Sequence, residues 1–215
     1  MCDGRHETTG HALKLAVERE TELALVARLR QGDADAFDDV YAAFNTRLFT
    51  FLLRLSRHRD VAEDLLEETW LRFVKFARRL RPDTRLGPWL FTVARNLYLS
   101  FNRTRVFEDS ATVSLMALWP FSLEQPSPFE AAAASELERR IERALAALPS
   151  TSREVLLLVA VAGLSHSDAA DVCGITPEAL RQRLHRARGA LTTALERDAA
   201  TASPAPGAVT SCPSR

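Results

Sequence analysis

The amino-acid sequence predicts an all-α protein made of two small helical domains joined by a flexible linker. Only 8 of the 215 residues are glycine, and alanine, leucine, arginine and glutamate dominate. Several long segments place apolar residues three and four positions apart, whereas no segment sustains the period-two alternation of a half-buried strand. The hydrophobic content of 47% and the charged content of 26% are ordinary for a soluble globular chain.

The first predicted domain covers residues 18–105 and follows a flexible N-terminal tail, 1–17. Gly32 and Asp33 interrupt its first helix, Asp60 is placed to cap its third, and Pro88 suits the first position of its fourth. The apolar face of the fourth helix, which we assign to the core, consists of Leu90, Val93, Ala94, Leu97 and Phe101. The four helices are expected over 18–31, 35–57, 60 to about 80, and 89 to about 103.

Residues 106–134 are predicted to form an interdomain linker. They contain three prolines and show no clear apolar period. A long segment without structure of its own is unusual inside one domain. Its apolar content is high for a free linker, which is compatible with packing on a domain or on a partner.

The second predicted domain covers residues 135–197 and ends in a disordered tail, 198–215. A helix from about 131 to 148 is followed by Thr151 and Glu154 at capping-box spacing, which open a strongly apolar helix that Gly163 closes. Ser165 opens a short helix and Gly174 makes the next turn.

The last predicted helix completes a helix-turn-helix. Thr176 is a good N-cap, Pro177 is a good first helical residue, and the helix is expected to reach Arg197. A short helix, a glycine turn and a longer helix are typical of a motif whose second helix enters the DNA major groove. One face carries Leu180, Leu184, Ala187 and Leu191, and the other carries Glu178, Arg181, Gln182, His185 and Arg186. The alternative is a solvent-exposed basic helix in a small bundle.

The net charge of zero hides strong local polarity. Residues 60–68 hold five acids and no base, residues 72–105 hold nine Lys or Arg against one acid, and residues 181–188 hold four arginines and no acid. A single charge run is most often a solvated helix face. Three runs of alternating sign on separate helices favour several partners.

Taken together, these segments resemble a bacterial RNA polymerase sigma factor of the small, two-domain extracytoplasmic-function (ECF) group. The resemblance covers roughly residues 22–105 and 135–195 and leaves out the linker and both tails. The segments that carry it are "LVARLRQGDADAFDDVYAAF" (25–44), "DVAEDLLEETWLRFVKF" (60–76), "GPWLFTVARNLYLSFNRTR" (87–105) and "ALAALPSTSREVLLLVAVAGLSHSDAADVCGITPEALRQRLHRARGAL" (144–191).

The resemblance implies that the acidic helix, residues 60–73, docks on the clamp helices of the largest subunit of the polymerase core. Acidic side chains steer association with a basic partner, and apolar anchors supply affinity. Leu66 is expected in the core, and Trp70 is open to either role. The residues expected to bind the core are Asp64, Leu65, Glu68 and Trp70.

The resemblance also implies that residues 83–88 and the following helix bind the promoter −10 element around a flipped base. Aromatic stacking offsets the cost of unstacking such a base, and arginines bind backbone phosphates. Ser100 stands where a related member has Asn. Trp89 is more readily a core residue. The residues expected to bind the −10 element are Arg85, Phe91, Val93, Arg95, Asn96, Ser100 and Arg103.

The helix-turn-helix is implied to read the promoter −35 element as duplex DNA, with the linker threaded through the RNA-exit path. Arg and Gln match purine edges, and Arg also binds phosphates. Glu178 departs from the small residue common in the family. The residues expected to bind the −35 element are Thr176, Pro177, Glu178, Arg181, Gln182, His185 and Arg186.

The resemblance implies a transcription factor and not an enzyme, and we expect no cofactor, no metal and no small-molecule substrate. Three scattered cysteines suggest a reducing cytoplasm, and Cys2, His6 and His11 lack a fourth metal ligand. An anti-sigma factor is an expected further partner, which could hold the protein at the inner face of the membrane.

Two alternatives stay open at this point. One is a helix-turn-helix transcriptional regulator with an N-terminal sensor or dimerisation domain. The other is a protein that occupies polymerase or an anti-sigma factor without initiating transcription.

Overall fold

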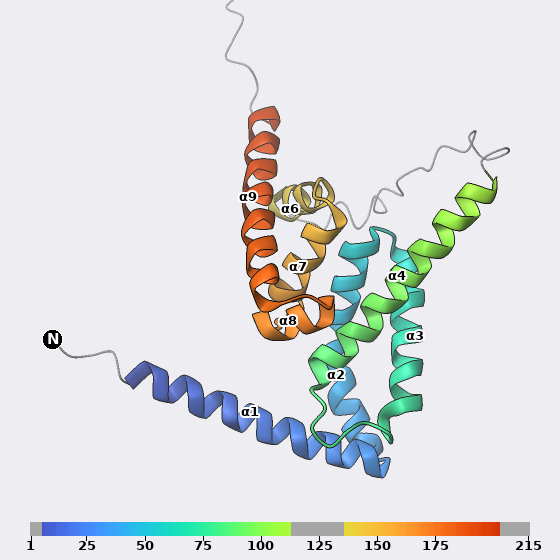
Figure 1. Cartoon of the computed structure of the whole chain (residues 1–215), viewed down its shortest axis with the longest axis vertical. Coiled ribbons are helices and arrows are strands. Elements are labelled where there is room, and N and C mark those ends of the chain that lie inside the picture. Colours follow the sequence, from blue (N-terminus) through green and yellow to red (C-terminus); the bar gives the residue numbers. More distant parts are fainter. Residues whose placement is uncertain (1–5, 113–135, 203–215) are drawn as a thin grey trace, which may run out of the picture.

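The computed structural model describes residues 6–112 and 136–202, and every element of regular structure in those two ranges is an α-helix. The all-α prediction is therefore confirmed. The helices form two groups, α1–α4 and α6–α9, which lie side by side (Figure 1). The predicted linker lies outside the described residues from position 113 onward.

The first group contains α1 (His6–Gln31), α2 (Ala34–Ser56), α3 (Arg59–Ala77) and α4 (Leu86–Thr112). Two of these helices are longer than expected. The segment before position 18 has no proline and several strong helix formers, so α1 begins at His6. No glycine or proline follows Arg103 until well beyond Thr112, so α4 continues past the predicted domain boundary at 105. Figure 1 shows α1 projecting from the base of this group.

The break between α1 and α2 is the one that the sequence predicts. Gly32 has a φ of +83°, a left-handed conformation that favours glycine. The side chain of Asp33 caps α2 by accepting hydrogen bonds from the amides of Asp35 and Ala36, at 3.0 Å and 3.4 Å. Arg28 lies 2.7 Å from the same carboxylate and holds the pKa of Asp33 below its usual value.

The predicted cap of α3 is wrong. His58 occupies the N-cap position without a side-chain hydrogen bond, and Asp60 lies inside the first turn. A carboxylate in the first turn still interacts favourably with the positive end of the helix dipole.

The second group contains α6 (Glu136–Ala146), α7 (Ser150–Ala160), α8 (His166–Cys173) and α9 (Pro177–Ala202). The hydroxyls of Ser165 and Thr176 cap α8 and α9 as predicted, accepting from the amides of Asp168 at 3.1 Å and Ala179 at 3.2 Å. Gly174 makes the turn between these helices with a φ of +66°. The helix-turn-helix is therefore present.

The predicted capping box at the start of α7 is wrong. The helix begins at Ser150 behind Pro149, and no side chain caps it. Glu154 is buried and faces the first group of helices, where it pairs with Arg95. Glu154 therefore makes an ion pair with a distant residue in place of the expected capping bond within α7.

The two groups pack against each other through one continuous apolar core, which the sequence did not predict. Helix α2 packs on α7 as well as on α3, and α4 packs on α8. Gly87 is buried at this junction, where a Cβ atom would lie 3.3 Å from a methyl group of Leu164. Close approach of the start of α4 to the α7–α8 turn therefore depends on the absence of a side chain.

Arg153 holds several helix ends together from inside the junction. Its guanidinium donates to the carbonyls of Leu145, Ala146 and Leu148 at 2.9 Å, 3.1 Å and 3.0 Å, and to Leu55 of α2 at 3.4 Å. Leu55, Leu145 and Ala146 lie in the last turns of α2 and α6, where carbonyls lack their α-helical partners. Burial lowers the pKa of Arg153.

Candidate protein and nucleic-acid interfaces

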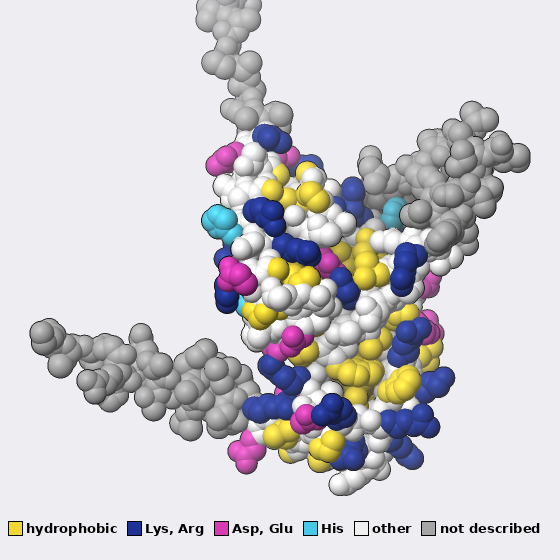
Figure 2. All heavy atoms as spheres, in the orientation of Figure 1, with side chains coloured by type: hydrophobic (Ala, Val, Ile, Leu, Met, Phe, Trp, Pro, Cys, Tyr) yellow, Lys and Arg dark blue, Asp and Glu magenta, His cyan; other side chains and the backbone are white. Residues whose placement is uncertain are grey.

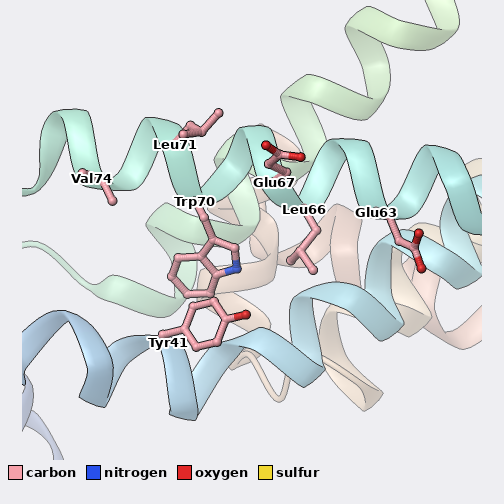
Figure 3. A pocket seen from close by; sticks show the side chains of 7 residues that line it. All are labelled: Tyr41, Glu63, Leu66, Glu67, Trp70, Leu71 and Val74. Carbon is pink, nitrogen blue, oxygen red and sulfur yellow. The ribbon is translucent and has the colours of Figure 1, made fainter.

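An open apolar groove lies between α2 and α3 (Figure 3). Its walls are mostly hydrophobic, although Glu63 and Glu67 stand along one side of α3. Leu71 and Val74 are 57% and 58% exposed, which is high for large apolar side chains. We call it the α2–α3 groove, and it is lined by Tyr41, Glu63, Leu66, Glu67, Trp70, Leu71 and Val74.

Trp70 forms the wall of this groove and also belongs to the core. Its side chain is buried, its indole nitrogen donates to Asn45 Oδ1 at 3.0 Å, and its ring lies 4.9 Å from the ring of Tyr41. Figure 3 shows the two rings meeting between α2 and α3. The two roles that the sequence left open for Trp70 are thus compatible.

The predicted roles of two neighbouring leucines, Leu65 at the docking surface and Leu66 in the core, are reversed in the structure. Leu65 is buried, whereas Leu66 is only partly buried and lines the groove. Asp64 and Glu68 lie outside the groove, and Glu68 pairs with Arg72 one turn further along α3 at 2.7 Å. Sequence reasoning did not assign Tyr41, Leu71 or Val74 to this surface, and the available signal for Leu71 and Val74 was apolar character away from the buried face of α3.

Some residues predicted to bind the −10 element are buried in the core, whereas others are exposed. Phe91 is fully buried and meets Phe51 edge-to-face with ring centroids 5.3 Å apart. It therefore belongs to the core and cannot stack on a flipped base, so that prediction is wrong. Val93 and Trp89 are partly buried against the same core.

The accessible part of α4 is polar. Asn96, Ser100 and Arg103 are exposed and follow one another at helical spacing. Arg103 Nη2 donates to Ser100 Oγ at 3.3 Å. These three side chains form one polar stripe that a nucleic acid can reach.

Two arginines of the predicted −10 set are engaged by the second group of helices. Arg95 pairs with Glu154 of α7, and Arg85 pairs with Asp168 of α8. The Arg95 side chain is only 18% exposed. Arg95 is therefore withdrawn from the surface in this conformation, which corrects its prediction, whereas Arg85 remains 50% exposed and pairs through Nη1 alone.

The outward face of α9 carries the residues predicted to read duplex DNA. Arg181, Gln182, His185 and Arg186 are exposed, and Leu180, Leu184 and Ala187 are buried beneath them. Thr176 and Pro177 are exposed at the helix start. Figure 2 shows basic, acidic and histidine side chains together along this edge.

Glu178 and Arg181 neutralise each other at the start of α9. The carboxylate accepts from Arg181 Nε at 3.1 Å and from Nη2 at 2.5 Å. The hydrogen bond from Arg181 lowers the pKa of Glu178. Glu178 thus pairs with Arg181 at the exposed start of α9, a contact that the sequence did not predict.

Arg186 also faces a second feature. Together with Arg183 it lines a small hollow against the start of α7, beside Pro149, Thr151 and Ser152. The four arginines of residues 181–188 are therefore not equivalent, since only Arg183 is partly buried.

Comparison with known proteins identifies the two groups of helices. The protein-family model for "Sigma-70 region 2" matches residues 40–106, and the model for "Sigma-70, region 4" matches residues 138–191. The ECF RNA polymerase sigma factor EcfG of Rhodopseudomonas palustris (strain TIE-1) is 36% identical over 165 residues, which cover 76% of this chain and 86% of the relative.

The chain belongs to the ECF family of RNA polymerase sigma factors.

A second relative of this sigma factor is RNA polymerase sigma factor CarQ of Myxococcus xanthus, 33% identical over 74% of this chain and 88% of the relative. Among solved structures, the Bartonella quintana sigma factor RpoE, crystallised with the anti-sigma factor NepR, has a TM-score of 0.61. It is 29% identical, covering 75% of this chain and 98% of RpoE. CnrH in complex with the cytosolic domain of CnrY, at 22% identity and a TM-score of 0.63, shares the fold over 82% of this chain and 98% of CnrH.

The family establishes what this sigma factor does in general terms. It binds RNA polymerase core and directs promoter-specific initiation of transcription. Sigma factors are DNA-binding initiation factors rather than enzymes. No helix in the described part of this sigma factor has the length and hydropathy to span a bilayer.

Proposed function

We propose that the sigma factor docks its α2–α3 groove on the clamp helices of the largest polymerase subunit. The observation that carries this proposal is an exposed apolar surface next to acidic side chains. Among residues 6–112 and 136–202 no other helix covers Leu71 and Val74, while Glu63 and Glu67 stand beside them. Such a surface combines apolar anchors with charges that steer a basic partner.

The polar stripe of α4 and the loop before it contact the −10 element in this proposal. Asn96 and Ser100 are the accessible hydrogen-bonding groups of the stripe, and Arg103 stands beside them for a phosphate. Arg85 joins this surface once it separates from Asp168.

The outward face of α9 reads the −35 element. Arg181, Gln182, His185 and Arg186 are held in order on an exposed helix by the buried leucines below. An acid beside DNA is favourable only opposite a cytosine amine, so Glu178 must contact such an amine or point away from the phosphates when Arg181 reads a base.

The described arrangement is a closed state that must open on polymerase. Ion pairs that join the two groups of helices include Arg54–Glu142, Arg85–Asp168 and Arg95–Glu154, and the last two hold arginines of the proposed −10 surface. We expect an anti-sigma factor to keep the protein in the cytoplasm and away from polymerase by stabilising this state; RpoE was crystallised with such a partner, the anti-sigma factor NepR.

Run-off transcription with purified core enzyme tests the proposal. Promoters are first located by sequencing transcripts after overexpression and aligning their start sites. Specific transcripts from those promoters, absent with core alone, are expected. Tight operator binding by the protein alone, without such transcripts, would instead favour a helix-turn-helix regulator.

A further inference from the structure

Helix α1 holds the backbone of the loop between α3 and α4, residues 78–85. Arg19 Nη2 donates to the carbonyl of Asp83 at 2.7 Å, and Nη1 donates to the carbonyl of Thr84 at a longer 3.5 Å. Glu22 Oε1 accepts from the amide of Leu86 at 2.8 Å. Three hydrogen bonds therefore connect side chains of α1 with consecutive or nearly consecutive peptide groups more than sixty positions away in the sequence.

These bonds satisfy groups that the loop cannot satisfy by itself. Leu86 is the first residue of α4, and the first amides of a helix have no acceptor within it. Glu22 supplies that acceptor from another helix, and its negative charge lies at the positive end of the α4 dipole. Arg19 meets the carbonyls on the other side of the same turn.

Arg19 and Glu22 also hold each other in place. Arg19 Nη1 lies 2.5 Å from Glu22 Oε2, one turn apart on α1. Both side chains are partly buried, 33% and 24% exposed. The pair is therefore an ordered unit against the loop, unlike a solvated surface pair with many alternative rotamers.

The position of the loop determines where the −10 surface begins. It carries Arg85 and sets the start of α4, the helix that presents Asn96 and Ser100. We propose that Arg19 and Glu22 are positioning residues for −10 recognition, which set promoter selectivity by fixing the α3–α4 loop. This inference rests on the proposed function of α4, and both residues precede the segment 40–106 that matches sigma-70 region 2.

The test compares full-length variants in run-off transcription with core enzyme, on one promoter and on a panel with each −10 base replaced in turn. Arg19→Ala and Glu22→Ala remove the bonds. Glu22→Gln keeps an oxygen acceptor for the Leu86 amide, so it is the conservative rescue. Arg30→Ala and Glu20→Ala are matched changes on exposed positions of the same helix.

We expect Arg19→Ala and Glu22→Ala to reduce the discrimination between −10 bases about fivefold, in the range of a single lost base preference. Discrimination between −35 bases and affinity for core should stay as in the wild type. Glu22→Gln should recover most of the −10 discrimination, and both matched changes should leave it unaltered.

A uniform loss of activity on every promoter would overturn the inference, because a merely structural pair lowers activity without changing relative preference. Unchanged −10 preference in well-folded Arg19→Ala would overturn it as well. Arg19→Ala carries the test if Glu22→Ala does not fold, since it leaves the amide of Leu86 bonded. Asn96→Ala and Ser100→Ala serve as references: if they too leave −10 preference unchanged, the proposed role of α4 fails, which is a separate result.

Discussion

Arg95 of α4 pairs with Glu154 of α7, and this ion pair joins the two halves of the sigma factor at a place where both side chains are largely buried. Glu154 is 9% exposed and Arg95 is 18% exposed. The sequence assigned one to DNA and the other to a helix cap. An arginine that the sequence predicts for the −10 element therefore joins the two groups of helices in this conformation.

Replacing Glu154 with Gln should weaken this closure. A charge-assisted bond to a partly buried guanidinium becomes a neutral one, which costs about 1–3 kcal/mol of unfolding free energy. Urea unfolding should show the loss, and X-ray scattering of the full chain should show a larger radius of gyration. Glu196→Gln, the same change at an exposed position of α9, should alter neither. Equal stability and size of the two variants would contradict the role of the pair.

Leu71→Asp should abolish docking on polymerase without unfolding the protein. Leu71 is 57% exposed, so the change should alter stability by about 0.5 kcal/mol or less. A charge within the apolar groove should weaken binding at least about tenfold. Titration against the clamp-helix fragment of the largest polymerase subunit measures this. Leu137→Asp, at a leucine 62% exposed on α6, is the matched control and should bind normally. Equal loss in both variants would place the docking surface elsewhere.

Arg181→Ala should weaken −35 recognition by about 1–3 kcal/mol, the usual contribution of an arginine that contacts a base edge. The measurement is open-complex formation by reconstituted holoenzyme on promoters with single −35 substitutions. The relative preference at one position should relax, while affinity for core should be retained. Arg188→Ala removes the same charge from an exposed position later on α9 and should leave that preference intact. If Arg181→Ala and the wild type showed the same relative preference at every −35 position, base reading by Arg181 would be contradicted.

Cys173 should resist alkylation in the folded protein. Burial raises the pKa of its thiol to about 11, with the nearby Glu154 acting in the same direction. The neutral thiol is favoured in the folded state, so this contribution to stability is present below pH 9.0 and lost as the pH rises toward 11. In a Cys2→Ser, Cys212→Ser variant, iodoacetamide at pH 7.5 should label Cys173 only after denaturation. Rapid labelling of native protein would show that the thiol is accessible.

The breaks between helices, and several of their caps, follow from local sequence. Gly32, Gly174 and the caps at Asp33, Ser165 and Thr176 act within a few residues of themselves, so their effects can be predicted without a partner. The apolar stripe of α9 likewise determines which face of that helix is exposed. These signals sufficed for the all-α architecture, the helix-turn-helix and the family.

The assignments that failed depend on contacts between distant segments. Leu65 and Leu66 are chemically alike, and Phe91 satisfies the pattern of an aromatic DNA contact as well as that of a core residue. Only the packing of α3 on α2, and of α4 on Phe51, decides which side chain is covered.

The sequence by itself determined the all-α architecture, the breaks at Gly32 and Gly174, and the caps at Ser165 and Thr176, because those depend on interactions over a few residues. The tertiary structure decided which charges face one another. Glu154 meets Arg95, Asp168 meets Arg85, and Glu22 meets the amide of Leu86. No local pattern encodes such pairs, since they arise only when burial in a shared core brings remote groups within hydrogen-bond distance.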